Sequence, residues 1–148
     1  MDFNELIADF ASRHEVENLV AVDDAAALDV DGIIVTIVAK GGVLTFTAEI
    51  GDPPAEGAAT FSNLLLEANM QPGAFFARAP EQGMYFIVLR LPLRSVDDDA
   101  FDSALESFVN QTETWRRLLA DFRPMAKATA ERAESESPSF GSTGFMPV

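Results

Sequence analysis

Residues 33–50 read IIVTIVAKGGVLTFTAEI and contain the pattern from which the fold can be predicted. After the Gly41-Gly42 pair, apolar residues occupy every second position from Leu44 to Ile50, with threonine or glutamate between them. Alternation with period two is typical of an antiparallel strand that has one buried face. A glycine pair between two such runs permits the positive φ angles of a tight hairpin turn. The stretch therefore predicts a hairpin of strands over 33–39 and 43–50.

Further strands are expected on both sides of this hairpin. Asp31-Gly32 is a second turn dipeptide, and it joins 33–39 to an extended run over 25–30. Pro53-Pro54 ends the meander, because proline can neither donate to a sheet ladder nor continue a strand. A second hairpin pairs 74–79 with 84–91 around residues 81–83, until Pro92. We expect five strands in one antiparallel sheet.

Three helices complete the pattern. Apolar spacing predicts helices over 3–14 and 58–69, the first with Asp2 as N-cap and Glu5 completing a capping box. A longer helix begins within 95–99 and ends before Pro124. The resulting order, αβββαββα with hairpin connections, indicates an α+β fold.

The chain divides into a domain over residues 1–123 and a C-terminal tail over 124–148. The tail is rich in serine, glycine and proline, a composition typical of segments outside a packed core. The apolar residues available to anchor it, in a groove that would otherwise receive a partner, are Phe140, Phe145, Met146 and Val148.

Charge limits the partners that the chain can have. Ten lysines and arginines against 24 acidic residues give a formal net charge of −14, which repels nucleic acid and anionic membranes. Within residues 1–31 the acids face Arg13 alone, so this part attracts a basic partner. The N-terminus lacks a signal peptide's basic and apolar regions, and no apolar run is long enough for membrane insertion. With no cysteine, the sequence suits a reducing compartment, and we expect a cytoplasmic protein.

No catalytic, metal or cofactor site is predicted. The sequence Asp29-Val30-Asp31-Gly32 resembles a calcium loop, but that register puts alanine and valine at ligand positions, so a hairpin turn explains it better. The acids at 97–99 are explained as the start of a helix, where carboxylates cap and complement the dipole. His14 ends the first helix in a capping or surface role. Without a second histidine or a cysteine, no nucleophile and base can be paired, and we expect a protein that is not an enzyme.

The sheet carries more apolar side chains than one buried face needs. Residues 33–38 and 84–89 are apolar on both faces, which a soluble monomer seldom exposes. One interpretation is that the long helix or the tail covers the second face, and the other is that this face binds a protein.

The chain resembles the Tir-chaperone (CesT) family, the class I chaperones of bacterial type III secretion, over about residues 1–122. The resemblance is carried by Leu65-Leu66-Glu67-Ala68-Asn69, by Leu89-Arg90-Leu91-Pro92-Leu93 and by the last helix, with Asp97, Phe101, Leu105, Phe108, Val109 and Trp115-Arg116. It implies a chaperone without nucleotide hydrolysis that holds the N-terminal segment of a secreted effector in extended form.

The resemblance also implies sites. A homodimer would form through the second helix and the neighbouring strand, at Leu64, Leu66, Phe75 and Phe76. The effector would contact the first helix and the sheet, for which the candidates are Phe3, Ile34, Val38, Met84 and Phe86. Two alternatives remain open at this point: a regulatory or structural subunit of a secretion apparatus, and an enzyme using clustered carboxylates.

Overall fold

The computed structural model describes residues 2–16, 18–81 and 83–123, so the tail predicted for 124–148 lies outside the described residues. Its helices and strands follow the order that the sequence pattern predicts, with one added strand. The elements are α1 (Phe3–His14), β1 (Val20–Val22), β2 (Ala25–Val30), β3 (Ile33–Lys40), β4 (Val43–Gly51), α2 (Ala58–Ala68), β5 (Phe75–Arg78), β6 (Tyr85–Pro92), a 3-10 turn η1 (Leu93–Ser95) and α3 (Asp98–Asp121).

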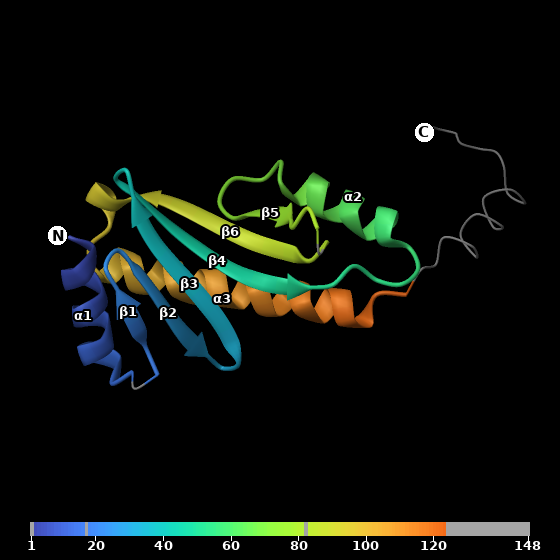
Figure 1. Ribbon diagram of the computed structural model, residues 1–148. Helices are drawn as coiled ribbons and strands as arrows, with labels where there is room; N and C mark the ends of the chain where they lie inside the picture. The colour runs from blue at the N-terminus through green and yellow to red at the C-terminus, as the bar shows by residue number, and fades with distance from the viewer. Residues whose placement is uncertain (1, 17, 82, 124–148) are drawn as a thin grey trace, which may run out of the picture.

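The strands form one antiparallel sheet in the order β1-β2-β3-β4-β6-β5 (Figure 1). This confirms the α+β class and the two predicted sets of hairpins. The sixth strand, β1, was not predicted, because its three residues are too few to show an alternating pattern. It pairs with β2, so the sheet ends on one side at β1 and on the other at β5.

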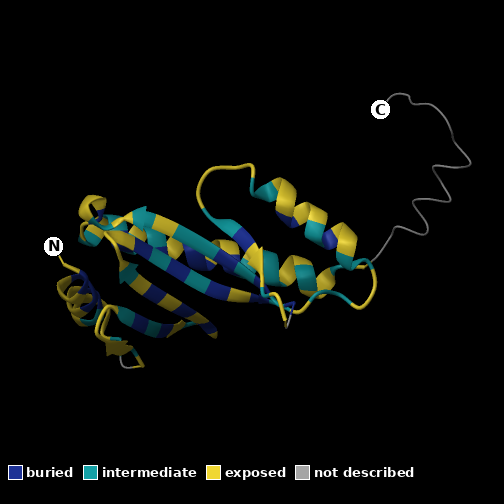
Figure 2. Ribbon diagram, turned by 45° about the horizontal axis from the view of Figure 1, so that its top comes forward, coloured by how far each residue is buried: buried dark blue, intermediate teal, exposed yellow. Residues whose placement is uncertain are grey.

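All three helices pack on the same face of the sheet. Phe46 of β4 contacts Phe101 and Phe108 of α3 at ring-centroid distances of 5.7 Å. Phe10 of α1 contacts Phe101 at 5.2 Å, and Phe61 of α2 contacts Tyr85 of β6 at 5.5 Å. Burial therefore alternates along the central strands, as the coloured bands of Figure 2 show. The helix-covered face is the core of the domain.

Local signals in the sequence act as expected. Asp2 and Glu5 form the predicted capping box, with the Glu5 amide donating to Asp2 Oδ1 at 2.8 Å. Asp97 is the N-cap of α3 and accepts from the Ala100 amide at 2.8 Å. The β2–β3 turn places Gly32 at φ +87°, and its amide donates to Asp29. The hairpin and helix-start interpretations of these acidic residues are confirmed.

The end of β4 is shaped by its contact with α3. Gly51 has φ +147°, and a Cβ there would lie 2.9 Å from Leu119 of α3. A pairing irregularity lies between Glu49 and Gly51, and Arg116 donates to the Glu49 carbonyl at 2.9 Å.

Within the described residues, no helix has the length and apolar character needed to cross a membrane.

Candidate functional site

The face of the sheet that the helices do not cover is the main candidate site. On β3, Ile33, Val35 and Ile37 are buried, whereas Ile34 and Val38 on the other side keep 53% and 37% of their surface exposed. Because side chains of one strand alternate between faces, the same division extends across the paired strands. We call this surface the open face, and its apolar members are Val20, Val22, Ala25, Ala27, Ile34, Val38, Val43, Phe75, Ala77, Phe86 and Val88.

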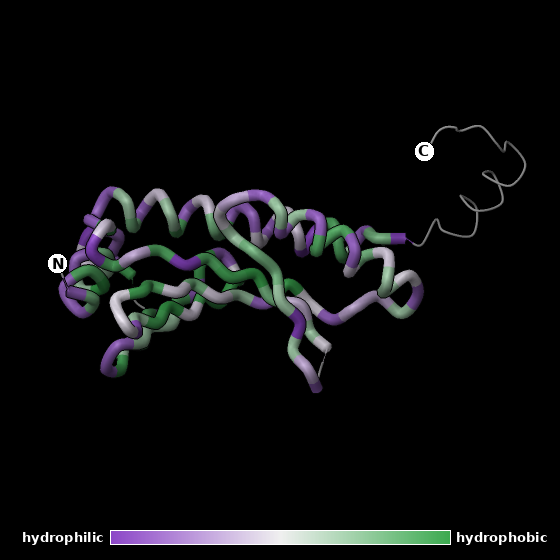
Figure 3. The backbone as a smooth tube through the Cα atoms, turned by 90° about the horizontal axis from the view of Figure 1, so that it is seen from above, coloured by the Kyte–Doolittle hydropathy of each residue, from purple (hydrophilic) through white to green (hydrophobic). Residues whose placement is uncertain are grey.

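The register makes the open face continuous. One row runs through the paired residues Thr36, Thr47, Val88 and Phe75 across four strands. Directly paired side chains in such rows have Cβ atoms about 4.5–5.5 Å apart, so they touch one another. Each threonine in these rows presents a hydroxyl group and a methyl group. Such side chains can contact both the polar backbone and the apolar side chains of an extended peptide. Hydrophobic residues, green in Figure 3, follow the strands along much of their length.

Four of the five predicted effector-contact residues lie on or beside this face. Ile34, Val38 and Phe86 belong to the open face, and Met84 directly precedes β6 and is half-buried. Phe3 does not. It is 3% exposed and packs in the core, because the apolar stripe of α1 faces the sheet. Phe3 therefore supports the fold and offers no surface to a partner in this conformation.

The four predicted dimer residues lie on three different surfaces. Leu66 is 63% exposed and lines, together with Phe76, a hollow of about 300 Å³ between α2 and β5. Phe76 itself is 9% exposed and packs against Trp115 at a ring-centroid distance of 4.8 Å. Leu64 is 43% exposed but lies about 200° around α2 from Leu66, since successive helix residues turn by about 100°. Phe75 points to the open face.

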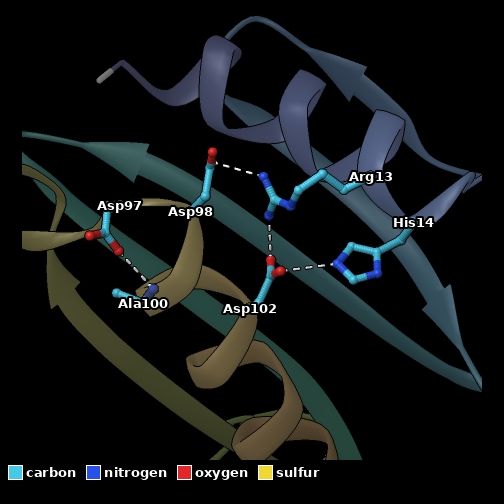
Figure 4. Close-up of polar contacts among 6 residues, drawn as sticks. All are labelled: Arg13, His14, Asp97, Asp98, Ala100 and Asp102. Carbon is cyan, nitrogen blue, oxygen red and sulfur yellow. Dashed lines mark hydrogen bonds and ion pairs between the residues drawn. The ribbon is translucent and has the colours of Figure 1, made fainter.

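A polar cluster ties the end of α1 to the start of α3 (Figure 4). Arg13 forms ion pairs with Asp102 and, at 3.0 Å, with Asp98. His14 Nε2 lies 3.0 Å from the second carboxylate oxygen of Asp102. His14 thus has the surface role expected for it.

The pKa of Asp102 reflects these contacts. Partial burial alone would raise it, but hydrogen bonds from His14 and Arg13 outweigh burial, and the pKa of Asp102 is lowered. The cluster is a contact between helices, as its side chains face one another. Among the described residues, no three His, Cys, Asp or Glu side chains come together in a way that could hold a metal ion.

Some exposed apolar residues were missed from the sequence. Val20 and Val22 are each 64% exposed on β1, and Met70 is 84% exposed just after α2. The alternation of Val20-Ala21-Val22 was the available signal, but three residues do not distinguish a strand from a loop. Val88 lies on the same face as Phe86, because the two residues are two positions apart on β6.

Comparisons with known proteins agree with this geometry. The family model described as "Tir chaperone protein (CesT) family" matches residues 5–116. A comparison with curated protein sequences gave no match.

Similar solved structures include three complexes. The HopA1-SchA chaperone-effector complex gives a TM-score of 0.66 at 14% identity, covering 78% of this chain and 93% of that one. The Yersinia pestis type III secretion chaperone SycH, solved with a fragment of YscM2, gives 0.61 at 16% identity, covering 77% and 99%. The ExoU-SpcU complex of the Pseudomonas aeruginosa type III secretion system gives 0.61 at 17%, covering 76% and 97%. These likenesses show the same fold.

Proposed function

Since the chain belongs to the Tir chaperone protein (CesT) family, we propose that it is a type III secretion chaperone that holds the N-terminal segment of a secreted effector in extended form before export. The open face is the observation that carries this proposal. It presents apolar side chains of β1, β2, β3, β5 and β6 on the side of the sheet opposite the helices, with Ile34 half exposed on β3. Two of the similar structures, a chaperone-effector complex and a complex of a type III secretion chaperone, support it.

The holding step uses two kinds of contact. Apolar side chains of the segment cover the open face, since removing apolar area from water is the largest favourable term in such binding. The edge strand β1 offers unpaired backbone groups, so an extended segment can add a strand there beside Val20 and Val22. The net charge of −14 accelerates the approach of a basic segment.

The proposal includes a homodimer in the bacterial cytoplasm. Leu66 lines the hollow between α2 and β5 and is the most solvent-exposed of the four predicted dimer residues. It is therefore the residue best placed to contact a second copy. Burying such a leucine is worth about 1.5–3 kcal/mol in each subunit. The chain acts by binding and contributes no catalytic step, as the family description of a chaperone suggests.

Capture from the native host tests the function. The tagged chain is purified under native conditions, bound proteins are digested by a protease, and the protected fragment is identified by mass spectrometry. The proposal predicts one protein whose protected fragment lies near its N-terminus and whose recovery falls with the Ile34→Asp variant. Recovery of secretion-apparatus components in equal amounts with both variants would instead identify a structural or regulatory subunit.

A further inference from the structure

A hollow lies at one end of the open face, where the β3–β4 turn meets the end of β6. It has a volume of about 940 Å³. Its lining combines apolar and cationic side chains, contributed by Val43, Leu91, Pro92, Leu93, Arg90 and Arg94. Leu93 is fixed there by its amide, which donates to the Gly42 carbonyl at 2.9 Å.

The two arginines of this hollow are unlike most others in the described chain. Arg13 pairs with two aspartates, and Arg116 donates to a backbone carbonyl. Within residues 2–16, 18–81 and 83–123, the side chains of Arg90 and Arg94 form neither an ion pair nor a hydrogen bond, and both residues are exposed. The Arg90 guanidinium lies 5.5 Å from the centre of the Phe75 ring. This contact holds its charge over the open face.

The charged residues around the hollow add to its positive charge. Lys40 extends the positive charge from the neighbouring strand, because it pairs with Val43, which lines the hollow. The acidic residue that lines the hollow is Asp2, and its carboxylate already accepts from the Glu5 amide in the capping box of α1. The hollow therefore carries local positive charge at one end of the open face, although the whole chain has a net charge of −14.

We propose that this hollow receives an aspartate or glutamate side chain of the bound segment and so fixes the segment's register on the open face. The inference rests on the proposed function and specifies the partner's chemistry. Arg90 and Phe86 are four residues apart on β6, about 13 Å at the rise of a strand. A segment lying along β6 thus carries an apolar side chain against Phe86 and an acidic one four residues away. A carboxylate can accept charge-assisted hydrogen bonds from the arginines of this lining.

Peptide titrations followed by NMR test this inference on the full chain. The probe GSLTVSESKG places leucine, valine and glutamate on one face of an extended strand, with the glutamate four positions after the leucine. Its partner GSLTVSQSKG differs only in the charge. We expect the glutamate peptide to bind about three- to tenfold more tightly, and to shift the Gly41 and Gly42 amide signals.

Two variants and one ion control the result. R90Q/R94Q should abolish the preference for glutamate, whereas R117Q, which removes an exposed arginine of α3, should keep it. Equal binding of both peptides to the open face would overturn the inference and leave the proposed function standing. No shift on the open face with either peptide would overturn both. A preference for the glutamate peptide that persists in R90Q/R94Q would also overturn the inference. The same holds if inorganic phosphate shifts the Gly41 and Gly42 amides while the two peptides bind equally.

Discussion

The contact between α1 and α3 allows a quantitative test of how the domain is held together. In Asp102→Asn, the side chain loses its ion pair with Arg13 and the carboxylate oxygen that lies 3.0 Å from His14 Nε2. These side chains are about one third to one half exposed, and exposed ion pairs each contribute about 0.2–1 kcal/mol. The expected loss is about 0.5–1.5 kcal/mol. With an unfolding entropy of about 0.25 kcal/mol/K for about 120 residues, the midpoint at pH 7 should fall by about 2–6 °C.

The stabilising contribution of Asp102 should depend on pH. Because the folded-state pKa of Asp102 is lowered from 3.8, its contribution is fully present above that pH and is lost as pH falls through the folded pKa. Thermal unfolding followed by circular dichroism should therefore show the variant and the wild type converging between about pH 4 and pH 2. The matched control is Glu106→Gln, an exposed acid one turn further along α3. A midpoint unchanged at pH 7, or a difference that persists unchanged at pH 2, would refute the assignment.

Three other predictions concern the sheet and the subunit contact. Leu66→Glu should convert a dimer to monomer in sedimentation velocity, while Leu118→Glu, an exposed leucine of α3, should not; an unchanged dimer would exclude the α2 contact. Phe86→Ala should weaken binding of the captured effector segment about fivefold, mainly by faster dissociation, whereas added salt should mainly slow association; abolition by salt alone would contradict this division. Gly51→Ala should lower the free energy of unfolding by about 1–3 kcal/mol in urea titrations, because of its φ of +147° and the contact with Leu119; an unchanged midpoint would refute the strain.

The sequence predicted the main elements because their signals were local. Asp2 with Glu5, the glycines of the hairpin turns and the alternation through Phe46 each act within a few residues, and the structure confirms all three. The strand β1 escaped prediction because its stability comes from pairing with β2 and not from a pattern of its own.

The candidate site was predictable only in part. Alternation on β3 placed Ile34 and Val38 on the face opposite Val35 and Ile37, but it did not tell which of these two apolar faces the helices cover. Burial of Phe3 depends on which way the stripe of α1 faces, and the separation of Leu64 from Leu66 depends on the helix turn between them. The positive hollow could not be predicted from the sequence, since it joins the turn after β3 to the end of β6, about 50 residues later.

In the proposed function, the open face, and not the helical side, receives the partner. Methyl NMR of the chain with the captured effector segment tests it most directly, because β3 carries its own control. We expect large shifts for the methyl groups of Ile34 and Val38 and small shifts for those of Ile33 and Val35, which face the helices on the same strand. The opposite pattern, with Ile34 unchanged and the largest shifts at Leu118 on α3, would contradict it.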